Sequence, residues 1–151
     1  MPGAFAANMG CPLPQSWTWA VKDYRPFLDS IRAGTAYHFR LAANPTFSRS
    51  AGDGKRGKVC AHITAEQQKG WLLARCEKSG FRLDSDGFEI VRRSILRFSK
   101  GAERRNVTLG VCEFEGLLTV TEETPFRAAL TEGIGRGKAY GQGLLTVVRP
   151  R

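Results

Sequence analysis

Histidine is scarce in this chain, and no two of its cysteines stand close together. There are two histidines among 151 residues, and the four cysteines at positions 11, 60, 76 and 112 form no CxxC pair. A zinc site needs about four clustered cysteine or histidine ligands, so this pattern excludes one. We therefore expect no metal and no other cofactor. The cysteines are expected to be reduced, mostly buried thiols of a cytoplasmic protein.

Long hydrophobic runs and nucleotide-binding glycine motifs are also missing. No stretch of about 18 apolar residues is present, which argues against a membrane-spanning helix. The stretch GIGRGKAYGQG at residues 133–143 is rich in glycine but lacks the GxxxxGK[ST] spacing of a phosphate-binding P-loop. It also follows a predicted helix and precedes a predicted strand, the reverse of the order in a P-loop or a Rossmann fingerprint. Both nucleotide-binding motifs are excluded.

Acidic residues are few relative to basic ones. The chain has 23 lysines and arginines against 14 acidic residues, which gives a formal net charge of +9. The sequence pI is about 9.9. With 42% hydrophobic residues, the composition is that of a folded domain. A folded, strongly basic domain is expected to bind an anionic partner, with nucleic acid first and a membrane surface a distant second.

The order of the predicted elements indicates a fold class. The apolar patterns and helix signals predict, in order, a strand at 36–44, a helix from Thr64, strands at 88–99 and 106–120, a helix at 121–133 and a strand after Gly143. This order predicts an α+β ferredoxin-like (split βαβ) sandwich, an antiparallel four-stranded sheet with two helices on one face. RNA-recognition domains share this plan, although their aromatic strand motif is absent here.

The two ends of the chain are expected to differ. Residues 1–33 are expected to be an N-terminal remnant or interdomain linker with a short helix. Residues 34–151 are expected to form the RNA-binding domain. Within that domain, Thr64 and Gln67 have the spacing of a capping box, and Pro125 is expected at the first position of the second helix. Each of the two long strands is expected to contain one irregularity, near Arg92–Arg93 and near Val111–Cys112.

The hairpin between those two strands is the strongest candidate binding element. Its cations outnumber its single acid, Glu103; they are Arg92, Arg93, Arg97, Lys100, Arg104 and Arg105. A two-stranded ribbon with such charges can enter or straddle a nucleic-acid groove and neutralise phosphates. The charges of an edge hairpin can also serve only to prevent aggregation. The excess of cations favours nucleic-acid contact.

Two glycine-rich segments leave two interpretations open. The segment SRSAGDGKRGKVCAH at 48–62, with Arg49, Lys55, Arg56 and Lys58, is either a loop that contacts phosphates or a surface insertion. Residues 133–143 are either a phosphate-binding loop or a helix stop whose glycines allow close packing. The candidate contacts there are Gly133, Gly135, Arg136, Gly137 and Lys138.

The sequence contains few candidate catalytic residues. Metal-free cleavage of RNA needs a base for the 2′-hydroxyl and an acid for the leaving oxygen. Histidine is the residue type suited to both roles near neutral pH, but the chain has only His38 and His62, and neither has a convincing local partner in the sequence. No catalytic residue is assigned.

Three stretches together resemble a known family. KDYRPFLDSIRAGTAYHFRLAANPTFS, KRGKVCAHITAEQQKGWLLARCEKSGF and ALTEGIGRGKAYGQGLLTV closely resemble the CasE family of CRISPR-associated proteins, the type I-E endoribonucleases that process crRNA. The resemblance runs from about Lys22 to Val148. It implies tandem ferredoxin-like domains of the RAMP superfamily, metal-independent cleavage of the repeat hairpin, and retention of the product within the Cascade complex.

The resemblance also implies which functions of the family belong to the residues of this chain. The family's catalytic histidine and tyrosine lie in its N-terminal domain, and the residues before Lys22 are too few to supply that domain. The chain is therefore expected to be the C-terminal portion, to bind the repeat RNA stem through the hairpin, and to be inactive alone. Its expected partners are the repeat RNA, other Cascade subunits and the missing N-terminal domain. The alternative is a non-catalytic RNA-binding structural subunit of an effector complex.

Overall fold

The computed structural model describes residues 21–50, 52, 57–101 and 105–151 of the chain. The chain divides into two compact units, Met1–Ser30 and Ile31–Arg151. In the first unit, helix α2 spans Arg25–Asp29 and carries Pro26 in its first turn, where a missing N–H costs no helical hydrogen bond. None of the helices in these residues has the length and apolar character needed to cross a membrane.

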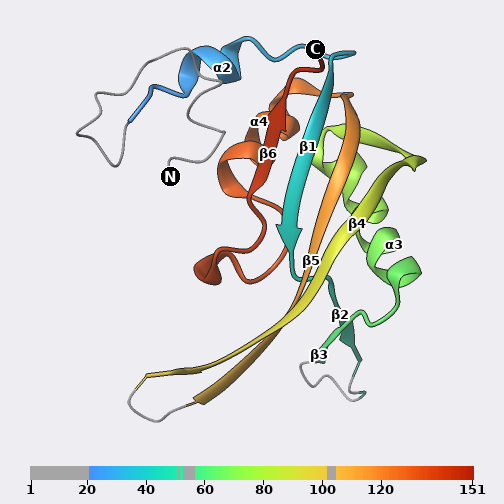
Figure 1. The fold of residues 1–151 in the computed structure, drawn as a ribbon, viewed down its shortest axis with the longest axis vertical. Coiled ribbons are helices and arrows are strands. Elements are labelled where there is room, and N and C mark those ends of the chain that lie inside the picture. The colour runs from blue at the N-terminus through green and yellow to red at the C-terminus, as the bar shows by residue number, and fades with distance from the viewer. Residues whose placement is uncertain (1–20, 51, 53–56, 102–104) are drawn as a thin grey trace. The chain divides into compact units, whose positions relative to one another are not determined.

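The second unit is built on a four-stranded antiparallel sheet in the order β4-β5-β1-β6. Helices α3 and α4 lie against the same face of this sheet (Figure 1). The element order and the helices on one face confirm the predicted ferredoxin-like, split βαβ fold. The elements are β1 (Ala36–Ala43), α3 (Ala65–Cys76), β4 (Phe81–Lys100), β5 (Arg105–Val120), α4 (Glu123–Glu132) and β6 (Leu145–Val148).

The core lies between the sheet and the two helices. Along β1 the side chains alternate as predicted, with Tyr37 buried and the following His38 exposed. Aromatic rings join the layers. The ring of Trp71 from α3 stacks 6.5 Å from Phe114 of β5, and Phe126 from α4 lies 6.2 Å from Tyr37. These contacts fix both helices on one face and leave the other face of the sheet open.

The two helices begin in different ways. At α3, the Thr64 side chain accepts a hydrogen bond from the Gln67 amide at 3.2 Å, and the Gln67 side chain accepts one from the Thr64 amide at 3.3 Å. This confirms the capping box. At α4 the prediction is wrong, because the helix follows Glu122 without a side-chain cap and Pro125 is its third residue. The Glu122 amide donates to the Gly80 carbonyl at 3.1 Å, so a tertiary contact precedes this helix start.

Two short strands interrupt the segment that the sequence indicated as a loop. Strand β2 (Thr46–Arg49) pairs antiparallel with β3 (Lys58–Ala61), and Arg49 lies opposite Lys58. Their side chains are mostly exposed, so the pair has no alternation of apolar and polar residues to reveal it. Two 3₁₀ turns, η1 (Glu77–Ser79) and η2 (Lys138–Tyr140), complete the described elements.

Candidate nucleic-acid interface

Strands β4 and β5 continue beyond the sheet as a two-stranded ribbon. The last β5 residue paired with β1 is Cys112, whereas pairing between β4 and β5 continues to Lys100 and Arg105. We call residues 94–100 and 105–111 the ribbon, and Figure 1 shows it projecting away from the sheet. This confirms the predicted hairpin. Arg104, one of the predicted contacts, lies outside the described residues.

The ribbon leaves the sheet at an irregularity in β4. The register of β4 against β5 shifts between Leu83 and Phe88 and again between Ile90 and Arg92. The second shift lies near the predicted slip at Arg92–Arg93. The alternation of β5 does slip at Val111–Cys112, where both side chains are buried. The bulge suggested there is wrong, because the extra residues lie in β4 and the pairing continues without a shift through this part of β5. A bulge of this kind bends the strand and increases its twist, which redirects the ribbon.

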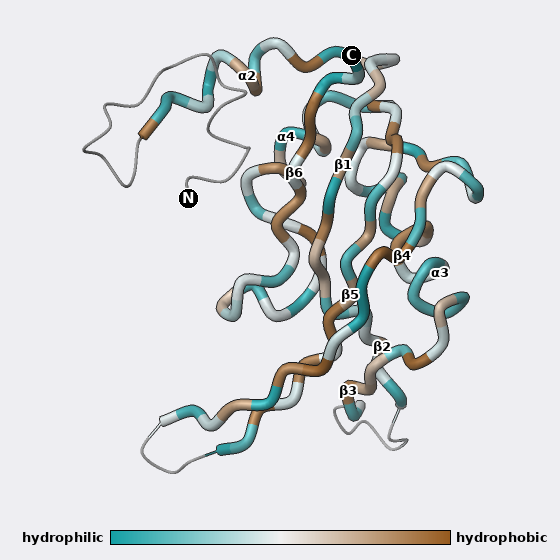
Figure 2. The backbone as a smooth tube through the Cα atoms, viewed as in Figure 1, coloured by the Kyte–Doolittle hydropathy of each residue, from teal (hydrophilic) through white to brown (hydrophobic). Residues whose placement is uncertain are grey.

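The two faces of the ribbon differ in chemistry. Directly opposed residues point to the same face. One face, which we call the apolar face, carries Leu96, Phe98, Val107, Leu109 and Val111. Leu109 and Val111 are only 8% and 6% exposed although they lie beyond β1. Figure 2 shows hydrophobic segments along the ribbon where it leaves the sheet.

The opposite face is open and polar. We call it the outer face, and its members are Ile95, Arg97, Ser99, Asn106 and Thr108. Ile95 is 64% exposed, and Arg97 is exposed near the middle of the face. Arg97 is therefore accessible from this face.

At the base of the ribbon, two of the predicted cations already have protein partners. The Arg92 guanidinium lies 3.7 Å from a carboxylate oxygen of Glu113. Arg93 donates a hydrogen bond to the backbone carbonyl of Ile63, just before α3. Both contacts tie the base of the ribbon to the body of the domain.

Toward the tip, the remaining described cations are exposed. Lys100 and Arg105 are both exposed and form the last pair of the ribbon. The Lys100 ammonium also lies 5.5 Å from the ring of Tyr140, within the range of a cation–π contact. Together with Arg97, these residues place three exposed cations on the half of the ribbon that is farther from the sheet.

Residues 133–143, which we call the glycine loop, are closely packed. A β-carbon on Gly135 would lie 2.7 Å from the Trp71 ring, and one on Gly143 would lie 2.5 Å from the Ile134 carbonyl oxygen. Both glycines have positive φ. A larger residue would therefore suffer both a steric clash and an unfavourable backbone conformation. Close packing explains why these two positions are glycine.

Most backbone amides of the glycine loop donate hydrogen bonds within the domain. The amides of Gly133, Ile134 and residues 140–143 donate to backbone carbonyls. Arg136 and Lys138 are exposed on the loop surface. The loop can therefore offer its cations to RNA more readily than these amides. Contacts of RNA with Gly133, Gly135 and Gly137 stay a prediction.

Three polar atoms are buried close to the loop. Within the described residues, the indole nitrogen of Trp71 and the side-chain oxygens of Asn44 and Gln142 have no hydrogen-bond partner. Backbone hydrogen bonds hold the loop beside these atoms, among them the bond from the Gly143 amide to the Ala42 carbonyl.

The β2–β3 pair carries a second, smaller group of cations. Arg49 and Lys58 are exposed and lie directly opposite each other, where like charges repel. An anion near this end would relieve the repulsion. Lys55 and Arg56 lie outside the described residues, so their role stays a prediction.

The two histidines lie on different elements. His38 is exposed on the open face of the sheet, between Leu117 and Val148 on the neighbouring strands. The His62 ring packs 4.9 Å from Phe47, and its Nδ1 atom is buried without a partner in the described part of the chain. No group of three or more potential metal ligands occurs among the residues that the structure describes. Among the residues that the structure describes, the neighbours given for the two histidine rings are thus apolar or aromatic side chains.

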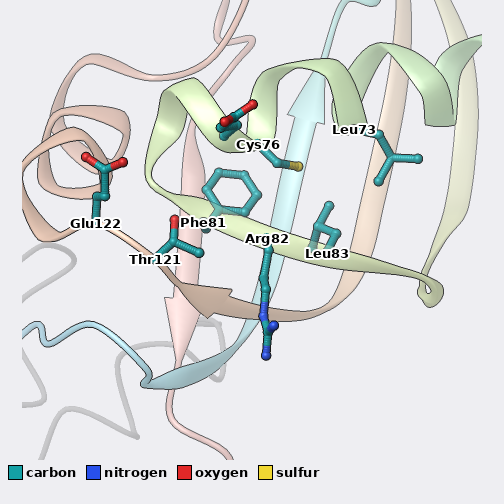
Figure 3. Close-up of a pocket in the computed structure, with 8 residues that line it drawn as sticks. Leu73, Cys76, Phe81, Arg82, Leu83, Thr121 and Glu122 are labelled. Atoms are coloured by element: carbon teal, nitrogen blue, oxygen red, sulfur yellow. The ribbon is translucent and has the colours of Figure 1, made fainter.

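A hollow lies at the end of the sheet opposite the ribbon (Figure 3). Its volume is about 390 Å³, and its lining includes Cys76, Phe81, Leu83 and Glu122. Arg82 points to the other side of the strand from Phe81. Burial raises the pKa of the Cys76 thiol to about 12, and the thiol donates to the Leu72 carbonyl at 3.2 Å. The hollow therefore contains a neutral thiol rather than an activated nucleophile.

The fold and the projecting ribbon define the structural class of the protein. It is a ferredoxin-like domain with a basic, two-stranded β-ribbon. The family described as CRISPR associated protein matches residues 6–149. The chain belongs to this family, which confirms the predicted family resemblance.

Known relatives agree with this assignment. The chain is 37% identical over 131 residues to the CRISPR-associated endoribonuclease Cse3 of Thermus thermophilus, covering 82% of this chain and 60% of the relative. It is also similar to a structure of CRISPR endoribonuclease Cse3 bound to a 19-nucleotide RNA, with TM-score 0.69 and 34% identity. That match covers 80% of this chain and 58% of the other.

A further match comes from a larger assembly. A chain in a CRISPR RNA-guided surveillance complex in its pre-nicking state is 25% identical, with TM-score 0.63, covering 83% of this chain and 58% of that one. The chain thus spans 58–60% of the length of these relatives.

Proposed function

We propose that this domain binds the base-paired stem of a CRISPR repeat RNA, with the ribbon placed along a groove of the stem. The observation that carries the proposal is the position of Arg97, Lys100 and Arg105 on a ribbon that extends beyond the sheet. Double-stranded RNA is recognised largely through its shape and its phosphates. A narrow projection with cations on both faces is suited to contacts with both backbones of a groove.

We further propose that the whole protein is a CasE-type endoribonuclease. It would process precursor crRNA at repeat hairpins and stay with the product in a Cascade complex. The support comes from the relatives, one called an endoribonuclease and bound to RNA, another part of an RNA-guided surveillance complex. The three described cysteines, Cys60, Cys76 and Cys112, are free thiols, which is compatible with a cytoplasmic site of action.

The residues of this chain are proposed to bind the stem without cutting it. Two contacts support this proposal: His38 lies between Leu117 and Val148 on the neighbouring strands, and the His62 ring packs against Phe47. Cleavage by general acid–base catalysis needs two positioned groups on the same phosphodiester. We therefore assign cleavage to residues of the whole protein other than these two.

The test combines binding and cleavage measurements. Fluorescence anisotropy with a labelled repeat hairpin is expected to show tighter binding than an unstructured RNA of equal length. A gel in the presence of EDTA is expected to show intact RNA. A variant with Arg97, Lys100, Arg104 and Arg105 changed to alanine is expected to bind much more weakly.

The control removes an equal charge from the opposite end of the sheet, by changing Lys78, Arg82, Arg149 and Arg151 to alanine. Equal losses in the two variants would show that net charge, rather than the ribbon, drives binding. Efficient cleavage of the hairpin would overturn the proposal that these residues bind without cutting.

A further inference from the structure

We propose that Tyr140 of the glycine loop braces the ribbon and fixes its direction before RNA arrives. Tyr140 is thus a positioning residue, which acts on RNA through the ribbon. The inference rests on the proposed function, because it concerns how the ribbon is presented to the stem.

The brace is an aromatic contact between elements far apart in sequence. The rings of Tyr140 and Phe98 lie 4.9 Å apart between centroids, at an angle of 59°. Such tilted arrangements are favourable for aromatic pairs. Lys100, two residues beyond Phe98, reaches the same ring from 5.5 Å. Tyr140 therefore contacts the ribbon twice on the same side, close to its tip.

The loop that carries Tyr140 is anchored to the sheet. The amide of Gly143 donates to the Ala42 carbonyl in β1 at 2.7 Å, and the Ile134 amide donates to the Gly143 carbonyl at 2.8 Å. The turn η2 is closed by the amide of Tyr140 itself, which donates to Gly137 at 2.9 Å. The brace thus transmits the position of the sheet to the ribbon.

The ribbon needs such a support. Beyond Cys112, its two strands pair only with each other in the described ladder. An isolated two-stranded hairpin is only marginally stable, and two-stranded ribbons twist more than sheets. Leu109 and Val111 are buried nearer the sheet, whereas Phe98 lies farther out on the same apolar face. The contact with Tyr140 extends the support toward the tip.

This arrangement supports the ribbon and leaves its cations exposed. The loop contacts the apolar face at Phe98, while Arg97 on the outer face and the Lys100–Arg105 pair near the tip are exposed. A ribbon held in one direction loses less conformational freedom when it binds than a mobile one. Preorganisation of this kind raises affinity by lowering the ordering cost of binding.

The experiment measures ribbon mobility and RNA affinity in the same set of variants. Tyr140→Ala is expected to speed hydrogen exchange of the ribbon amides at residues 96–98 and 107–109 in the free protein. It is also expected to weaken hairpin RNA binding by about 2- to 12-fold, the range expected for loss of one aromatic pair. Tyr140→Phe keeps the ring and is expected to behave like the wild type in both measurements.

Phe98 supplies the second half of the test. If the two rings act on each other, Phe98→Ala and Tyr140→Ala are expected to be non-additive in both measurements. Leu144→Ala removes an exposed side chain nearby (61% exposed) and is the control, expected to change neither. Unchanged exchange in α3 checks that each variant is folded.

Each contrary result has a definite meaning. Weaker RNA binding with unchanged ribbon exchange would show that Tyr140 contacts RNA directly, which overturns the brace. Faster exchange with unchanged affinity would also overturn it, since the brace would not serve binding. If the wild-type protein fails to bind the hairpin, the proposed function fails, while the exchange measurements still test the contact itself.

Discussion

Gly135 lies directly against the indole ring of Trp71, so that a β-carbon on the glycine would come within 2.7 Å of ring atom Cζ2. Trp71 is in the middle of α3 and stacks on Phe114 in the sheet, and the guanidinium of Arg75 lies over its ring, 4.2 Å from the centroid. One tryptophan therefore joins the glycine loop, helix α3 and the sheet. The position of the loop depends on the absence of a side chain at residue 135.

Gly135→Ala is expected to destabilise the protein more than Gly141→Ala. Both residues have positive φ, so both substitutions cost roughly 1–2 kcal/mol of backbone strain. Only the β-carbon at residue 135 meets a neighbour, and such overpacking adds about 1–3 kcal/mol, since nothing lies within 4 Å at residue 141. Urea unfolding of the two variants measures the difference. Equal losses would mean that the loop can move away from Trp71.

Thr64→Ala is expected to lower the free energy of unfolding by about 1 kcal/mol, because α3 loses the side-chain half of its capping box. Thr64→Ser keeps the hydroxyl group and is expected to be nearly neutral. Thr124→Ala is the matched control, since Thr124 lies inside α4 and does not cap it. Thermal or urea unfolding checks all three. A neutral Thr64→Ala variant would show that packing alone fixes the start of α3.

Arg97→Ala is expected to reduce the salt dependence of RNA binding. Each phosphate contact that is lost lowers the slope of log K against log salt by about 0.7–0.9. Arg97 is exposed on the outer face of the ribbon, whereas Arg92 is paired with Glu113 at the base. Arg92→Ala is therefore expected to leave the slope nearly unchanged. Anisotropy titrations at several salt concentrations provide the test, and a larger change of slope for Arg92→Ala would reverse the assignment.

Cys76 is expected to resist alkylation in the native protein. Burial raises its pKa to about 12, so it stays a neutral thiol at pH 7 to 9, and only the thiolate reacts rapidly. Cys60 is half-buried in β3 and is expected to react before Cys76. Iodoacetamide labelling followed by peptide mass spectrometry, in native and denatured protein, measures both sites. Rapid labelling of native Cys76 at pH 8 would show that α3 opens locally.

Local sequence patterns were sufficient to predict those features whose physical cause lies within a few neighbouring residues. The alternation around Tyr37 predicts β1, and the spacing of Thr64 and Gln67 predicts how α3 starts, because both signals lie within a few residues. The excess of cations between residues 92 and 105 likewise predicts a basic hairpin. The order of these elements then leaves few alternatives to the ferredoxin-like fold.

The failed predictions have tertiary causes. The bulge expected at Val111–Cys112 lies in β4 instead, because the register depends on both strands of the ladder. The start of α4 follows a hydrogen bond between Glu122 and Gly80 rather than the proline signal. Strands β2 and β3 were not predicted because they are short and exposed, so no apolar pattern marks them.

The sequence by itself determined the fold class, the family and the segment with the densest positive charge. Only the tertiary structure decided which of those charges contact the protein, with Arg92 and Arg93 bound at the base and Arg97 exposed on the outer face of the ribbon. It also showed that glycines at positions 135 and 143 serve close packing. The reason is physical: composition and periodicity record what a residue can do, whereas its neighbours in space determine what it does.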